Sequence, residues 1–382
     1  MVGKGGVGKS TIASASAVAA ARAGERVLLV SLDEAHSLRD VFGADIADIA
    51  DSADSADIAV TGAVGRGSLE LREVDTLALA ARRWGALTGS ALGPRIAETA
   101  GELLPEELTA APGVQEFLGM AEVADLAACG RWDRVVVDCP PTGAALRMLE
   151  IPSALSAYLE RLWPRHRRLG RIPSSARMLA AVGAAEQLES SASRIGTLVG
   201  DGAHSAVTVV TAPGGVAAAE TRRVLTALGL AGPPVHSVVV NRSRGADGAE
   251  AYDGLRVVRV PEAEDEPVGV AALARLSEAL DRAADSAGPA TATSARGSAS
   301  ATTVHLESGT GLDSVYTLSV RMPFADEVKA GRAGDDLVLT AGGVRRRVPL
   351  APVLRRCTVQ DATLGKGVLR IRFRPDPEVW PL

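Results

Sequence analysis

The first ten residues, MVGKGGVGKS (Met1–Ser10), contain the stretch that decides the fold. Residues 3–10 fit the pattern G-x-x-x-x-G-K-[ST]. In such a loop the glycines let backbone N–H groups converge on phosphate oxygens, and the N-terminus of the following helix adds positive potential. The sequence therefore predicts a nucleotide-binding loop between a buried strand and a helix.

The residues of this loop have distinct expected tasks. Lys9 is expected to reach the β- and γ-phosphates, and Ser10 to supply a hydroxyl to Mg²⁺. The chain has only four lysines, and two of them, Lys4 and Lys9, lie in this loop, which argues against the alternative of a plain glycine-rich turn. The residues expected to bind ATP here are Gly3, Gly5, Gly6, Val7, Gly8, Lys9, Ser10 and Thr11.

The composition indicates a globular protein of two domains. The chain has 382 residues, of which 47% are hydrophobic and 23% charged. A net charge of −5 and only 3% aromatic residues argue against nucleic-acid binding. Cys129, Cys139 and Cys357 are too few and too widely spaced for a disulfide framework or a cysteine-rich zinc site. We find neither a signal peptide nor an apolar run of about 18 residues, so we expect a cytoplasmic protein without a membrane span.

Five short apolar runs alternate with helical segments through most of the chain. Buried strands in this arrangement predict an α/β fold, a P-loop NTPase whose mostly parallel sheet is covered on both faces. Functional groups should then lie at the carboxyl ends of the strands. We expect this ATPase domain to span 1–284, with an inserted helical subdomain at about 76–128 and 151–200. The residues that end the five runs are Asp33, Asp138, Pro213, Asn241 and Pro261.

Three other segments differ in character. The three-residue repeat at 44–59 is expected to be a surface loop, and the Ser/Ala/Thr/Gly stretch at 285–303 a linker. The basic run RLWPRHRRLGR (161–171) predicts a solvated helix end, with contact to an anionic surface or client as the alternative. Residues 304–375 alternate like strands without a helical pattern, which predicts a small all-β sandwich.

Two motifs carry a family resemblance. LDEAHSLRDVFG (32–43) and VVVDCPPTGAALRML (135–149) resemble the switch motifs of the arsenite-pump and tail-anchored-protein-targeting ATPases. The resemblance implies that Asp33 orients the attacking water and that Asp138 supports Mg²⁺, through a water molecule. It also places Thr142 and Gly143 in the second switch. Without the resemblance, Asp33 could be only a helix cap.

The same resemblance suggests a homodimer. A second lysine early in the loop marks its deviant form, in which the residue matching Lys4 reaches the nucleotide of the partner subunit. With one loop in the chain, two copies are the economical arrangement. The resemblance further implies that Asn241 hydrogen-bonds adenine and that Pro261 begins the loop flanking the base, although Asn after a strand is also an ordinary turn residue.

Departures from the family pattern bear on function. Glu34 replaces a proline and Ala144 a histidine, and the chain lacks cysteines suited to zinc or arsenite, so a metalloid-pump role is not expected. We expect a Mg²⁺-dependent ATPase that couples ATP hydrolysis to handling of an unidentified protein client, with a hydrophobic client left open. The alternatives are an ATP-independent chaperone or scaffold with a degenerate nucleotide site, and, less favoured, a partitioning-type regulator.

The C-terminal segment resembles an α-crystallin (small heat-shock) domain. Such domains appear in this order in a bacterial and plastid branch of the same ATPase family. The domain is as consistent with a functional role, in client binding or in organisation of the dimer, as with a purely structural appendage. The matching residues are Tyr316, Pro323, Leu337, Leu339, Ala362, Gly367 and Leu369.

The loop begins at residue 3, whereas such a loop normally follows a strand inside the sheet. Loss of that strand would leave ladder groups of its neighbours unpaired. We therefore expect that the native chain has a Val/Ile/Leu-rich strand of about five to seven residues upstream of Met1. The intact mass of the native protein would test this expectation.

Overall fold

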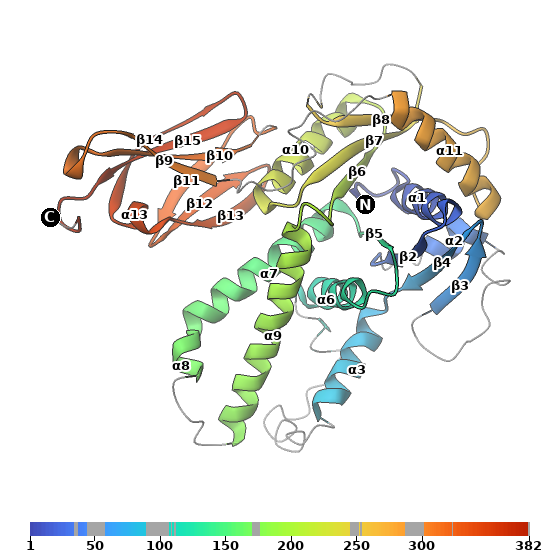
Figure 1. Ribbon diagram of the computed structural model, residues 1–382, viewed down its shortest axis with the longest axis horizontal. Coiled ribbons are helices and arrows are strands. Elements are labelled where there is room, and N and C mark those ends of the chain that lie inside the picture. The colour runs from blue at the N-terminus through green and yellow to red at the C-terminus, as the bar shows by residue number, and fades with distance from the viewer. Residues whose placement is uncertain are drawn as a thin grey trace.

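The α/β body and the all-β domain expected from the sequence are both present in the computed structural model (Figure 1). The structure describes residues 1–33, 37–43, 58–88, 107, 109–110, 112–169, 176–244, 252, 254–286, 302–322 and 324–380. Most of the repeat at 44–59 and of the linker at 285–303 therefore lies outside the described residues. Ile58 and Ala59, the last of the repeat that are described, begin a strand.

Two four-stranded sheets form the body, in the orders β3-β4-β2-β5 and β1-β6-β7-β8. The five apolar runs of the sequence are all strands, and they pair in parallel with their neighbours within each sheet. These strands are β2 (Arg26–Ser31), β5 (Arg134–Asp138), β6 (Val207–Thr211), β7 (Val235–Ser243) and β8 (Arg256–Pro261).

The first three residues lie between the two sheets. Strand β1 (Val2–Gly3) pairs in parallel with β6, where Val2 faces Val209. On its other side, the Met1 amino group donates a hydrogen bond to the Val137 carbonyl at 2.6 Å, and the Cys139 N–H donates to the Met1 carbonyl at 3.2 Å. The loop therefore starts from the centre of the combined sheet, and the upstream strand stays a prediction.

An edge hairpin was not predicted from the sequence. Strand β3 (Ile58–Val64) pairs antiparallel with β4 (Gly67–Glu73), and β4 pairs in parallel with β2. Strand β3 is the edge strand of this sheet and begins at the end of the three-residue repeat, whereas β4 alternates leucine with charged residues. Strand β4 therefore lacks the continuous apolar run that marks β2.

The side chains of β2 alternate between two cores. Val27 and Leu29 pack on one face with helices α1 (Lys9–Ala23) and α11 (Val270–Ser286). Leu28 and Val30 pack on the other face with α6 (Val114–Ala128) and α9 (Ala176–Gly200). This two-sided burial explains why the strand is apolar along its length rather than alternating.

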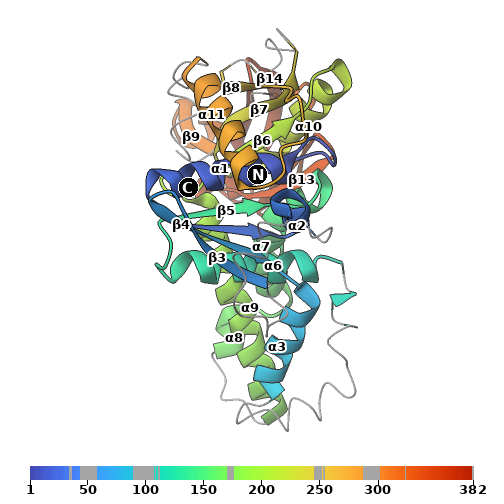
Figure 2. The same cartoon turned by 90° about the vertical axis from the view of Figure 1, so that its right-hand side faces the viewer.

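The helical part forms an arm that extends away from the sheet, as both views show (Figures 1 and 2). It contains α3 (Thr76–Thr88), α7 (Thr142–Leu162), α8 (Arg165–Leu169) and α9. Helix α7 begins at Thr142, ahead of the expected start at 151, and continues through Pro152. The expected second switch and the arm thus belong to one helix.

Arg168 in α8 is buried, so the expectation of a solvated helix end is wrong for this residue. Its side chain is 0% exposed, and its guanidinium lies 2.5 Å from Glu189 and 3.3 Å from Glu186, both on α9. Glu160 on α7 lies 3.9 Å away. A buried cation requires such partners, and this one ties α8 to its two neighbours.

We predict that Arg168→Met lowers the free energy of unfolding by about 2 kcal/mol. This is the contribution expected of hydrogen bonds to a charged group when the carboxylates left behind can regain water. Hydrogen exchange in α8 and in the turns of α9 around Glu186 and Glu189 should accelerate. Denaturant unfolding and exchange measurements check this. The exposed neighbour Arg167→Met is the matched control, and equal effects from the two variants would contradict a special role of Arg168.

The C-terminal domain packs a four-stranded antiparallel sheet, β14-β15-β10-β9, against a three-stranded one, β11-β12-β13. Leu318, Leu339 and Ile371 lie in its core, and Tyr316 packs against Trp380 with ring centroids 6.0 Å apart. The strands are β9 (Thr302–Ser308), β10 (Val315–Arg321), β11 (Lys329–Ala333), β12 (Asp336–Ala341), β13 (Val344–Pro349), β14 (Cys357–Gly365) and β15 (Val368–Pro375).

Candidate nucleotide site

The loop between β1 and α1 has the backbone form that its sequence requires. Gly6 and Gly8 have φ values of 79° and 88°, in the left-handed region that favours glycine. Helix α1 begins at Lys9 directly after Gly8, and no side chain caps its first turn. The first N–H groups of a helix have no partner within the helix, so this end of α1 suits an anion.

Asn241 at the carboxyl end of β7 holds the loop in place. Its side-chain amide donates a hydrogen bond to the Val7 carbonyl at 2.9 Å, and its side-chain oxygen accepts one from the Arg242 N–H at 3.0 Å. A Cβ atom built on Gly8 would lie only 2.4 Å from the Asn241 amide nitrogen. Close packing, as well as the positive φ, thus requires glycine at position 8. The expected adenine contact of Asn241 stays a prediction.

We predict that Gly8→Ala lowers the free energy of unfolding by about 2 kcal/mol or more, since it adds backbone strain and displaces the Asn241 amide. Thermal or denaturant unfolding without nucleotide is the measurement. Gly5→Ala is the control, because a Cβ atom at position 5 meets nothing within 4 Å and the backbone there needs no positive φ. Comparable destabilisation by both substitutions would show that the Asn241 contact is unimportant.

Asp138 ends β5 and is fully buried. Burial raises the pKa of its carboxyl group and nearby Asp33 adds to the rise, whereas the Ser10 hydroxyl, the N-terminal ammonium and Lys9 lower it. Ser10 lies close enough to act on this pKa, yet neither carboxylate oxygen of Asp138 accepts a hydrogen bond of ordinary geometry. Buried carboxylates lacking such bonds are costly. The oxygens of Ser10 and Asp138 therefore fit a hydrated Mg²⁺.

Asp33 lies at the end of the neighbouring strand β2, on the same edge of the sheet as Asp138. The backbones meet there through a 2.9 Å hydrogen bond from the Leu32 N–H to the Asp138 carbonyl. The Asp33 N–H donates to the Ser31 hydroxyl at 3.3 Å. The structure thus gathers Ser10, Asp33 and Asp138 at one point, with buried Lys9 near enough to act on Asp138.

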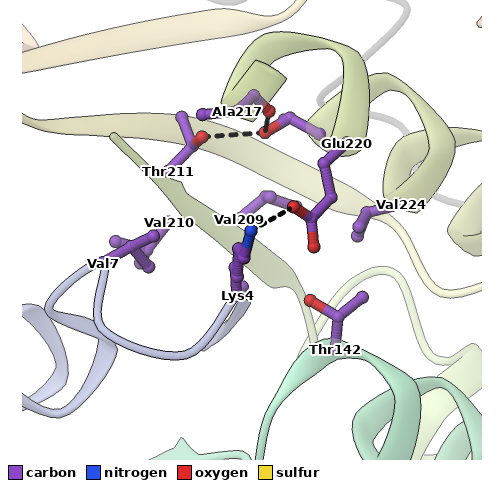
Figure 3. Close-up of a pocket in the computed structure, with 11 residues that line it drawn as sticks. Lys4, Val7, Thr142, Val209, Val210, Thr211, Ala217, Glu220 and Val224 are labelled. Carbon is purple, nitrogen blue, oxygen red and sulfur yellow. Dashed lines mark hydrogen bonds and ion pairs between the residues drawn. The ribbon is translucent and has the colours of Figure 1, made fainter. Parts of the chain in front are cut away.

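Lys4 occupies a different environment from Lys9. Its side chain is 58% exposed, and its ammonium lies 3.3 Å from a carboxylate oxygen of Glu220 on α10 (Gly215–Ala231) (Figure 3). An ion pair this exposed contributes at most about 1 kcal/mol. Lys4 is therefore held lightly at the surface of its own chain. The sequence contains Glu220, but nothing in its spacing from Lys4 indicates this pairing.

Thr142, the first residue of α7, lies near the Lys4–Glu220 pair (Figure 3). These three residues line a small cavity of about 20 Å³ together with apolar groups of β6 and α10. That volume holds about one water molecule and no ligand. The cavity marks the place where the loop, α7 and α10 come together.

Three further residues predicted for the site lie at the ends of helices or strands. Thr11 lies in the first turn of α1, and Gly143 in that of α7. Pro261 ends β8 as an exposed residue and pairs with Ser243 of β7, beyond Asn241. Their expected contacts with nucleotide stay predictions.

Comparison with known proteins agrees with this geometry. Residues 1–250 match the family model described as anion-transporting ATPase, and residues 313–373 match the HSP20-like domain found in ArsA. Protein Rv2184c of Mycobacterium tuberculosis is 41% identical over 412 aligned residues, which cover the whole of this chain and 96% of that protein.

More distant relatives carry functional names. The chain is 30% identical to putative arsenical pump-driving ATPase 1 of Aquifex aeolicus, over 46% of this chain and 43% of that protein. It is 27% identical to ATPase GET3 of Chaetomium globosum, over 73% of this chain and 88% of that protein.

Within the described ranges, no helix has the combined length and apolar character of a membrane span.

Proposed function

The chain belongs to the anion-transporting ATPase family, and from this membership and its loop we propose that it binds ATP with Mg²⁺ and hydrolyses it. The observation that carries the proposal is the convergence of Ser10, Asp33 and Asp138 beside an open helix N-terminus. A phosphate-binding loop next to two carboxylates suits phosphoryl transfer to water.

The roles follow from position and chemistry. The backbone of residues 3–10 would bind the phosphates, and Lys9 would neutralise charge on them. Ser10 and Asp138 would hold Mg²⁺, which supplies further charge neutralisation when bound. Asp33, partly exposed at the end of β2, would accept a hydrogen bond from the attacking water and orient it.

We further propose that the working form is a homodimer that acts on a protein client. Support for the dimer comes from the exposure of Lys4, which can leave its light contact with Glu220 and reach a second copy. Support for a client comes from the family resemblance and from the α-crystallin-like domain. We do not propose metalloid transport, because the three cysteines lie in different parts of the fold and form no common thiol site. Cys129 is exposed at the end of α6, Cys139 follows Asp138, and Cys357 is buried in the β-domain.

The test is phosphate release by the purified full chain with ATP and Mg²⁺, with and without a chelator. We expect turnover that requires Mg²⁺, and sedimentation that shows dimers with ATP bound. An intact chain that releases no phosphate would favour the ATP-independent chaperone or scaffold instead. A chain that hydrolyses ATP but sediments only as a monomer would remove the dimer from the proposal.

A further inference from the structure

The C-terminal β-domain is docked against two helices of the ATPase body. Leu230 of α10 belongs to the buried core of the β-domain, and Phe324 of the β-domain packs against a core that includes Ala145 of α7 and Val224 of α10. Figure 1 shows the β-domain beside both helices. These apolar contacts, one in each direction, define an interface between the β-domain and the ATPase body.

Charged pairs accompany these apolar contacts. Burial raises the pKa of Glu150 on α7 and lowers the pKa of Arg346 on β13. The charge on each side chain partly reverses the pKa shift of the other. Glu150 and Arg346 therefore lie near enough to act on each other's charge across the interface, and the Arg346 guanidinium lies over the end of α10, 3.5 Å from where a Cβ atom on Gly232 would stand. Arg222 of α10 lies 2.9 Å from Asp326, and Arg161 of α7 lies 3.6 Å from Asp336.

The N-terminal parts of the two docked helices both lie beside the phosphate-binding loop. Thr142 is the first residue of α7, and Glu150 follows about 12 Å along the same helix at 1.5 Å per residue. On α10, Glu220 pairs with Lys4, and Leu230 lies about 15 Å further on. The β-domain therefore bridges the far parts of two helices whose near ends line one cavity.

We propose that ATP binding shifts α7 relative to α10 and that the β-domain is a brake on this shift, because it holds the two helices together. The inference rests on the proposed ATP-dependent function and adds its regulation. Any shift of α7 relative to α10 must break contacts on one side of the bridge. By linkage, ATP binding weakens docking by the same factor by which docking weakens ATP binding.

The test uses the full chain and Mg²⁺ with the non-hydrolysable analogue AMP-PNP. Arg346→Glu places a carboxylate opposite Glu150 and should loosen docking, so AMP-PNP should bind at least about fivefold more tightly. Arg345→Glu, which makes the same charge change at an exposed position of β13, should leave the affinity unchanged. The charge-swapped double variant Glu150→Arg/Arg346→Glu should return the affinity toward the wild-type value.

Hydrogen exchange in the unaltered chain provides a measurement that needs no variant. AMP-PNP should accelerate exchange in β13, because nucleotide binding and docking oppose each other. Unchanged exchange in β13 on binding, or equal affinities of Arg346→Glu and wild type, would overturn this inference while leaving the ATPase proposal standing. A wild-type chain that does not bind AMP-PNP would overturn the proposed function, and the brake with it.

Discussion

Asp33→Asn is expected to lower ATP turnover at least about 100-fold while leaving ATP affinity within a few-fold of wild type. The amide keeps the size of the side chain but cannot accept a proton, and its oxygen is a weaker partner for the attacking water. Phosphate binding depends on the loop backbone, which the substitution does not touch. Single-turnover hydrolysis and equilibrium ATP binding, measured on the same preparation, separate the two effects.

The matched control is Asp40→Asn. Asp40 is exposed on α2 (Ser37–Phe42), seven positions after Asp33. Its substitution changes the net charge by the same amount. It should hydrolyse ATP at the wild-type rate. Turnover by Asp33→Asn equal to that of Asp40→Asn would reject the assignment of the water-orienting role to Asp33. A variant that holds ATP without hydrolysing it would also serve to capture a client.

The central strands and the loop were predictable from the sequence for a physical reason. Strands buried on both faces must be apolar, and β2 and β5 show this as short runs of Val and Leu, with Asp33 two residues after β2 and Asp138 at the end of β5. Parallel strands place their carboxyl ends at one edge, so Asp33 and Asp138 could be expected to meet although about a hundred residues separate them. The structure places β2 and β5 side by side.

Other features depend on contacts that no local pattern encodes. Asn241 supports the loop because β7 ends close to Val7, a proximity set by strand order and not by spacing. The pairing of Lys4 with Glu220 and the burial of Arg168 are similar cases. In a basic run, the arginine that turns inward looks like its solvated neighbours until the acidic partners on another helix are known.

Removal of the Lys4 charge is the second large expected effect. Lys4→Gln should lower turnover about 100- to 1000-fold, the range for losing one cationic group that stabilises charge on the transferred phosphate. ATP binding to the isolated chain should change little, because Lys4 points to Glu220 and is mostly exposed. Lys329→Gln, an exposed lysine of the β-domain, is the control for loss of one positive charge.

Mixing two inactive variants distinguishes action within one chain from action across a dimer. Lys4→Gln supplies an intact Asp33 site, and Asp33→Asn supplies an intact Lys4. If Lys4 acts on the partner's nucleotide, each mixed dimer contains one complete site, so an equal mixture should recover about a quarter of the wild-type rate on random pairing. If Lys4 acts on its own nucleotide, no site in the mixture is complete. Activity that stays at the sum of the separate variants would therefore assign Lys4 to its own chain, and would remove the main reason for a homodimer.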